Sequence, residues 1–244
     1  MKIPLLCLGF LATLAFPAFP QTQAAKEIKV LVLTGGHAFK AEPFFKMFQD
    51  NPEITFTADK QVKAAEAYER ADLFSFDVVV LYDAPREMTD AQKARFLALF
   101  DKGIGLVVLH HAYLAYPMWP EFGRIAGGQY VYTKEQFESG LTSSTYKGDV
   151  DIPVTVVDPQ HPVTAGLHDF VLRDELYSHM HMVGEVTPLL KTGDELLAWT
   201  RMEKHSRVVG LIVGHGCYAD PNFRKLLAQS IRWAARRNAR LLRF

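Results

Sequence analysis

The chain has 244 residues, with 27 basic side chains, 27 acidic side chains and two cysteines. This balance of charge gives no electrostatic basis for binding nucleic acid or an anionic membrane surface, so neither is expected as a partner. Two cysteines in a chain of this length also exclude a small fold held together by disulfides.

Residues 1–24 have the pattern of an export signal. Lys2 gives a short basic start, an apolar stretch covers residues 3–16, and residues 22–24 form a small-residue cleavage site. The apolar stretch is shorter than the roughly 20 residues of a membrane-spanning helix. We therefore expect cleavage and release into the periplasm or outside the cell, with an uncleaved anchor as the alternative.

Cleavage would leave residues 25–244 as the mature chain. It removes one lysine and no acidic residue, so the mature net charge is near −1. It also removes Cys7 and leaves Cys217 as the single thiol, which cannot form an intrachain disulfide. We expect Cys217 to be a buried structural residue, because no base is placed to activate it.

Short apolar runs alternate with helix-like segments along the mature chain. This alternation predicts one α/β domain over residues 25–244, with a mainly parallel sheet covered by helices on both faces. The expected strands cover residues 28–33, 54–57, 77–82, 104–109, 154–157, 196–199 and 208–213.

Two helices have clear start signals, and one long segment has no regular pattern. Thr89 followed by Gln92 predicts a capping box, and Asp220 followed by Pro221 predicts the start of the last helix. Residues 127–151 are polar and lack a sustained period, so we expect this excursion to be functional or mobile.

Three predicted strands end in histidine. His37 follows the first strand, His110 and His111 follow the fourth, and His215 follows the last. In a parallel sheet the carboxyl ends of the strands share one edge, where ligands bind. We therefore expect these imidazoles to converge in one pocket. The alternative is that His37 and His215 merely occupy tight turns, since both stand beside glycines.

Two further segments carry side chains suited to a sugar or a metal. Tyr113, Tyr116 and Trp119 offer flat faces against which a sugar ring can stack, although they could equally close the core. If residues 174–181 are extended, alternation places a carboxylate, a phenol and two imidazoles on one face. The four are Glu175, Tyr177, His179 and His181. The alternative for this segment is an exposed edge strand with solvated side chains.

The usual signatures of several enzyme classes are absent from the sequence. There is no Gly-x-Gly-x-x-Gly after a strand, no phosphate-binding loop, no His-Glu-x-x-His and no Gly-x-Ser-x-Gly. Dinucleotide binding, zincin proteolysis and serine hydrolysis are therefore disfavoured.

The sequence resembles the ThuA-like, or trehalose-utilisation, family over roughly residues 27–237. The resemblance rests on the order and spacing of several motifs: Gly-Leu-Val-Val-Leu-His-His-Ala at 105–112, Trp-Pro-Glu-Phe at 119–122, Gly-Gly at 127–128, His-Pro-Val-Thr-x-Gly-Leu at 161–167, Asp-Glu-Leu-Tyr at 174–177, Gly-His-Gly at 214–216 and Pro-x-Phe-Arg-x-Leu-Leu at 221–227. It implies a flavodoxin-like three-layer α/β fold similar to class I glutamine amidotransferases. Those enzymes carry a catalytic cysteine where this chain has His110 and His111, so amidotransferase activity is not implied.

The resemblance also implies a role in the use of trehalose and related disaccharides. We therefore predict an exported enzyme that acts on a disaccharide or glycoside, including its 3-keto form, as a hydrolase or lyase. In this interpretation His110 or His111 is the base and Glu175 a second carboxylate. The competing hypothesis is a non-catalytic carbohydrate-binding or accessory protein. The sequence leaves open whether the chain forms a homo-oligomer.

The remaining candidate residues have predicted binding roles. A divalent ion, zinc before others, would polarise the substrate best. Its predicted ligands are His37, His179 and His215. The residues predicted to contact the sugar are Tyr113, Tyr116, Trp119, Tyr177 and His181.

Overall fold

Residues 27–61, 65–85 and 87–236 are described by the structure, a computed structural model of the chain. The predicted export signal over residues 1–24 lies outside this part. The strands are β1 (Ile28–Gly35), β2 (Ile54–Gln61), β3 (Val78–Asp83), β4 (Gly105–Leu109), β5 (Gly128–Gln129), β6 (Thr145–Val156), β7 (Phe170–Ser178), β8 (His181–Met182), β9 (Thr187–Thr192), β10 (Glu195–Glu203) and β11 (Ser206–Leu211).

Helices connect the strands from β1 to β6, and α5 follows β11. The α-helices are α1 (Ala41–Gln49), α2 (Asp90–Asp101), α3 (Pro120–Ala126), α4 (Lys134–Glu138) and α5 (Pro221–Ala234). Three short 3₁₀ helices are η1 (Glu66–Glu69), η2 (Leu73–Ser75) and η3 (His110–Leu114). Within the described ranges, no helix is long and apolar enough to cross a membrane.

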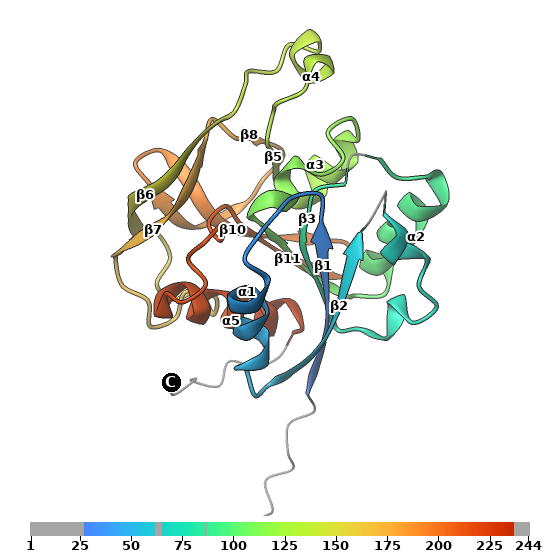
Figure 1. Cartoon of the computed structure of the whole chain (residues 1–244), viewed down its shortest axis with the longest axis horizontal. Helices are drawn as coiled ribbons and strands as arrows, with labels where there is room; N and C mark the ends of the chain where they lie inside the picture. The colour runs from blue at the N-terminus through green and yellow to red at the C-terminus, as the bar shows by residue number, and fades with distance from the viewer. Residues whose placement is uncertain (1–26, 62–64, 86, 237–244) are drawn as a thin grey trace, which may run out of the picture.

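One large sheet organises the described chain (Figure 1). Its strand order is β2-β1-β3-β4-β11-β10-β9-β6-β7, and the first five strands run parallel to one another. The other four continue the sheet by antiparallel pairing. The predicted α/β fold with a mainly parallel, flavodoxin-like sheet is confirmed, and the antiparallel extension is an addition to it.

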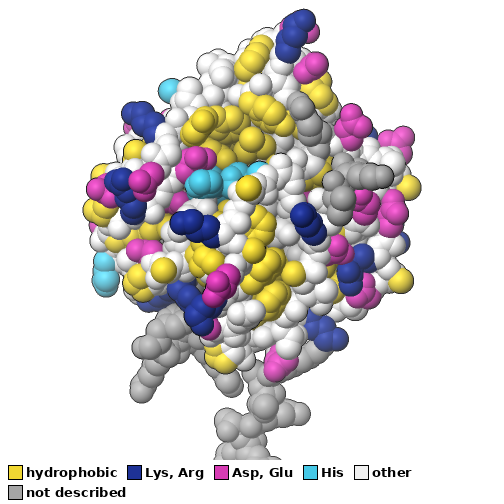
Figure 2. All heavy atoms as spheres, in the orientation of Figure 1, with side chains coloured by type: hydrophobic (Ala, Val, Ile, Leu, Met, Phe, Trp, Pro, Cys, Tyr) yellow, Lys and Arg dark blue, Asp and Glu magenta, His cyan; other side chains and the backbone are white. Residues whose placement is uncertain are grey.

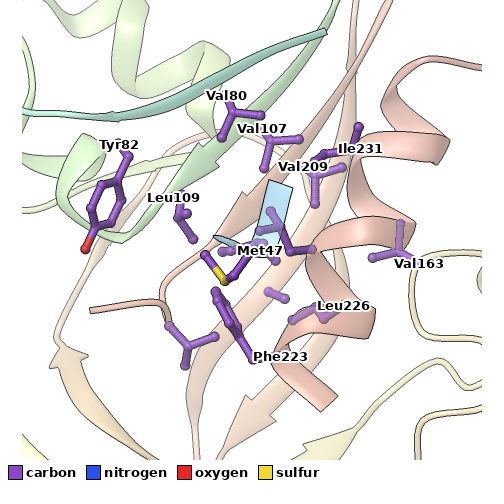
Figure 3. Close-up of a cluster of buried hydrophobic side chains, with 14 of the residues drawn as sticks. Met47, Val80, Tyr82, Val107, Leu109, Val163, Val209, Phe223, Leu226 and Ile231 are labelled. Carbon is purple, nitrogen blue, oxygen red and sulfur yellow. The ribbon is translucent and has the colours of Figure 1, made fainter. Parts of the chain in front are cut away.

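Helices cover the two faces of the parallel half because its strands are apolar on both sides. Along β1, Val30 and Val32 join one buried cluster, whereas Leu31 and Leu33 join the other. Figure 3 shows the first cluster, in which Met47 of α1 and three residues of α5 pack against the sheet. The α5 residues are Phe223, Leu226 and Ile231. The second cluster lies under α2, α3 and the 3₁₀ helices.

The predicted helix starts are confirmed. The Thr89 side chain accepts a hydrogen bond from the Gln92 backbone, and the Gln92 side chain accepts one from the Thr89 backbone, as in a capping box. Asp220 caps α5 by accepting from the backbone N–H of Asn222 and Phe223 at 2.8 and 3.0 Å.

The excursion over residues 127–151 is more regular than its composition suggests. It contains β5, α4 and the first half of β6, a strand longer than the four residues predicted at 154–157. Strand β6 pairs with β7 and β9 in antiparallel fashion. Many of its side chains are exposed, so the sequence carries little of the apolar signal by which a strand is recognised.

Candidate functional site

The carboxyl ends of three parallel strands bring four imidazole rings together. His37 follows β1, His110 and His111 follow β4, and His215 follows β11. The ring centroids of His37 and His111 lie 3.1 Å apart, and His215 lies 5.3 Å from His110 and 5.1 Å from His111. We call this group the histidine cluster. Figure 2 shows histidine side chains gathered on one face, beside a hydrophobic area.

Backbone geometry places His110 at the base of the cluster. The chain leaves β4 and immediately enters η3, and His110 takes a φ of 42°, a left-handed conformation that is uncommon for residues other than glycine. Its side chain is completely buried. Such local strain is typical of functional sites, where the surrounding structure holds the residue in place.

His110 is hydrogen-bonded to Glu175. Nδ1 of His110 lies 2.5 Å from the carbonyl oxygen of Ile212, and Nε2 lies 3.2 Å from Oε1 of Glu175. A carbonyl only accepts, so Nδ1 carries a hydrogen, and a second proton must lie between Nε2 and the carboxyl group. This hydrogen bond holds the pKa of Glu175 below its usual value, although burial opposes the shift. Tyr177 also bonds to Glu175 and stacks on the His110 ring at 4.1 Å.

His111 and His37 are held neutral. Burial lowers the pKa of His111 far below its usual value, and the neighbouring histidines lower it further. Burial also lowers the pKa of His37, whose Nδ1–H donates to the Ala38 carbonyl oxygen at 2.8 Å. Nδ1 of His111 and Nε2 of His37 are buried without a hydrogen-bond partner. Buried, unpaired ring nitrogens are rare where histidine serves only packing.

Asp174 fixes the turn that carries His215. Its buried carboxylate accepts from the backbone N–H of Gly214 at 2.6 Å, of His215 at 3.2 Å and of Gly216 at 2.8 Å, and from the Cys217 thiol at 3.3 Å. Gly214 has a φ of 124°, and a Cβ there would lie 2.6 Å from Leu109. The turn therefore requires glycine at position 214 for steric reasons.

Cys217 is buried, as the sequence suggests. Burial raises the pKa of its thiol, and the adjacent Asp174 carboxylate raises it further. A thiol in this environment is a poor nucleophile. The residues that follow β4 are His110 and His111, so no thiol stands at the end of that strand.

Two predicted sugar-binding residues require correction. Tyr113 is completely buried and packs against Trp199, and Tyr116 is 2% exposed. Both belong to the core, so neither offers a face to a sugar. Trp119 is partly buried against Phe96 and lines a separate hollow under α2, with no ring contact to the histidine cluster. Aromatic residues after a strand can close the hydrophobic core or form a binding surface, and the sequence pattern is the same in both cases.

The predicted metal ligands are not assembled. His179 lies just beyond β7 with its Nδ1 3.4 Å from the Thr145 hydroxyl, and His181 lies in β8, paired with Gln129. Within the described residues, neither makes a ring contact with the histidine cluster, and no group of three or more histidine, cysteine or acidic side chains is arranged to hold a metal ion. His179 therefore does not join His37 and His215, because the chain turns after Ser178 and strand alternation stops.

Sequence reasoning missed Tyr82, the residue before the last in β3, at the same edge of the sheet. Its ring packs edge-on against His37 at 5.3 Å and His111 at 5.1 Å. Its hydroxyl lies 2.7 Å from that of Tyr218, which donates to the His215 carbonyl oxygen at 2.5 Å. The rule that singled out the three histidine strand ends would also have found this residue.

A pocket opens beside the histidine cluster. It has a volume of about 630 Å³, within the range of roughly 300–1,000 Å³ that is common for small-molecule sites. Glu175 and His215 connect it to the cluster, and most of the remaining wall comes from the loop after β1 and from β6. Its other notable lining residues are Phe39, Lys40, Asp149 and Arg173.

The fold and this edge define an α/β protein with a histidine cluster at the carboxyl ends of its parallel strands and a pocket beside it. The chain belongs to the ThuA family, described as trehalose utilisation, whose profile matches residues 29–234. No match is found among curated protein sequences.

Solved structures support the same fold. A ThuA-like protein from Parabacteroides merdae is 22% identical, with a TM-score of 0.72 over 86% of this chain and 90% of that one. A ThuA-like protein from Bacteroides uniformis is also 22% identical, with a TM-score of 0.67 over 88% and 95%. A β-galactosidase from Rahnella sp. R3 is 13% identical, with a TM-score of 0.54 over 85% of this chain and 32% of that one.

Proposed function

We propose that this protein is an exported enzyme of carbohydrate use that cleaves a disaccharide or glycoside in its 3-keto form. The observation that carries the proposal is the contrast within the histidine cluster. His111 is neutral and has a free ring nitrogen, whereas His110 and Glu175 together hold a proton. A base and an acid side by side are what an elimination beside a carbonyl requires.

The reaction follows from the chemistry of the 3-keto sugar. The carbonyl at C3 acidifies the hydrogen on C2, and His111 takes that proton. The electron pair left on C2 forms a double bond to C1 as the bond from C1 to the glycosidic oxygen breaks. The oxygen takes the electron pair of that bond and a proton from the His110–Glu175 pair. Addition of water across the new double bond then completes a net hydrolysis and restores both groups.

Two further residues have roles in this scheme. Partial negative charge develops on the C3 carbonyl oxygen, and His215 is the ring available to donate a hydrogen bond to it. Tyr177 holds Glu175 and His110 in register by bonding to one and stacking on the other. His37 cannot donate from Nε2 while its Nδ1 carries the hydrogen, so it serves to keep His111 neutral and oriented.

Export is supported by the basic, apolar and small-residue pattern over residues 1–24. Amino-terminal sequencing of the protein expressed with its full leader tests this part. A mature terminus near residue 25 in the periplasmic or secreted fraction is expected, and an intact leader would contradict it. The divalent ion stays a prediction, which elemental analysis of the unchelated protein tests.

The central experiment incubates the protein with a native disaccharide and with the same sugar oxidised at C3. We expect free monosaccharide from the oxidised sugar, and a loss of at least about 100-fold in kcat for His111→Ala. His168→Ala is the matched control, because His168 lies exposed in a loop and should leave kcat unchanged. Binding of the sugar without turnover by the unaltered protein would overturn the proposal and favour the non-catalytic alternative.

A further inference from the structure

The pocket beside the histidine cluster has one wall built from a break in strand pairing. In the β6–β7 ladder Lys147 pairs with Leu176 and Val150 with Asp174. Gly148 and Asp149 therefore stand opposite the single residue Glu175, which is a β-bulge. Bulges redirect side chains and are over-represented beside active sites.

The bulge turns Asp149 out of the ladder. Asp149 adopts a φ of 51°, and its carboxylate accepts a hydrogen bond from Nε of Arg173 at 2.8 Å. A Cβ on Gly148 would lie 3.7 Å from Oε2 of Glu175, so the bulge stands directly over that carboxylate. The strained backbone thus places an exposed ion pair at the rim of the pocket, above Glu175.

The opposite wall is the loop between β1 and α1. Phe39 is held by aromatic contacts to Tyr82 at 5.3 Å and Phe44 at 5.1 Å, and it lines the pocket. Lys40 follows it, exposed, and in the described part of the chain it forms no ion pair of its own. The hydrogen bond from Arg173 lowers the pKa of Asp149 most, and the positive charge of Lys40 lowers it further. Lys40 on one wall of the pocket is therefore close enough to Asp149 on the other wall to interact with it.

These walls match a neutral, hydroxyl-rich ring. Phe39 provides an apolar ring, Lys40 and Arg173 provide donors, and Asp149 and Glu175 provide acceptors. Both signs of charge are present around the pocket, so a uniformly charged ligand would meet repulsion on one side. A sugar presents apolar C–H faces and hydroxyls that donate as well as accept, which suits this combination.

The position of Glu175 indicates which sugar ring of the substrate occupies the pocket. Glu175 lines the pocket, whereas His111 does not. Because the His110–Glu175 pair supplies the proton to the departing oxygen, the departing group must lie on the Glu175 side. We propose that the pocket between the β1–α1 loop and the β6 bulge is the subsite for the leaving sugar, a neutral pyranose. This inference rests on the proposed function.

Two substrates with the same reacting ring test the subsite. One is a 3-keto disaccharide, and the other is the matching methyl 3-ketoglucoside, whose leaving group is methanol and does not fill the pocket. Kinetic constants are measured for Phe39→Leu, which keeps the apolar packing, and for the double variant Lys40→Ala with Asp149→Ala. Lys46→Ala is the control, since Lys46 lies on the exposed side of α1 and pairs with Asp50.

For the disaccharide we expect KM to rise about tenfold in both test variants, with kcat/KM for the methyl glycoside within twofold of the unaltered enzyme. Equal losses on both substrates, or no loss on either, would overturn the subsite while the proposed function stands. If the unaltered enzyme turns over neither substrate, the proposed function itself fails. The two failures are therefore distinguishable.

Discussion

Nε2 of His110 lies 3.2 Å from Oε1 of Glu175, although 65 residues separate them in the chain. His110 comes from the carboxyl end of a parallel strand, and Glu175 from the antiparallel extension of the sheet. The contact therefore joins the two halves of the sheet at one point, beside the pocket. Asp174, the preceding residue of β7, holds the His215 turn.

The first prediction concerns the carboxylate of Glu175. Glu175→Gln keeps the shape of the side chain but removes the group that shares a proton with His110. We expect kcat on a 3-keto disaccharide to fall by at least about 100-fold, because a positioned acid contributes roughly 10²–10⁴. Glu185→Gln, at an exposed position, is the control. Activity within fivefold of the unaltered protein would remove Glu175 from the mechanism.

The second prediction concerns the protonation of His111. Its pKa is lowered by burial and by three neighbouring histidines, so the neutral form persists well below the ordinary value near 6.5. We expect the ring resonances of His111, assigned by comparison with His111→Asn, to stay constant in NMR spectra between pH 8 and pH 5. A titration centred between pH 6 and 7 would show that burial and the neighbouring histidines do not lower the pKa of His111.

The third prediction concerns Asp174. Asp174→Ala removes the acceptor of three backbone N–H groups, and leaving buried donors unpaired costs about 1–3 kcal/mol each. We expect the free energy of unfolding, measured with urea at neutral pH, to fall by about 3–5 kcal/mol in total. Asp174→Asn keeps one acceptor oxygen and should lose less.

Asp151→Asn is the matched control for that experiment. Asp151 lies on the neighbouring strand β6, with an exposed side chain that pairs with Arg173. Such exposed pairs are worth at most about 1 kcal/mol. An equal effect of the two asparagine variants would mean that Asp174 does not organise the turn.

The fourth prediction concerns the pH dependence of stability. Asp83, the last residue of β3, is buried, and burial raises its pKa from 3.8 to about 6 despite a hydrogen bond from Gln61. Between these values the folded protein binds a proton that the unfolded chain has lost. The stabilisation is therefore complete below about pH 4 and is lost as the pH rises through 6.

Asp83→Asn tests this dependence because the amide does not ionise. The variant should gain stability relative to the unaltered protein as the pH rises from 4 to 7, by up to about 3 kcal/mol for a shift of this size. Urea unfolding at a series of pH values measures the difference. A difference that does not change with pH would show that Asp83 does not titrate in this range.

The sequence by itself determined the parallel half of the fold and the position of the histidines. Continuous apolar runs are buried on both faces, and a residue that follows such a strand must lie at the carboxyl edge of the sheet. His37, His110 and His215 could therefore be placed together without a structure. The helix caps at Thr89 and Asp220 could also be predicted from the sequence, because a cap depends on residues no more than three positions away.

Only the tertiary structure decided which residues surround the histidines. Tyr113 and Phe39 are both aromatic residues after a strand, yet one is buried in the core and the other lines the pocket. The contact between Glu175 and His110 depends on where the antiparallel pair β6–β7 lies relative to the parallel strands. The β6 bulge depends on the register between β6 and β7. Burial and register are set by contacts between distant segments, so no local pattern of residues encodes them.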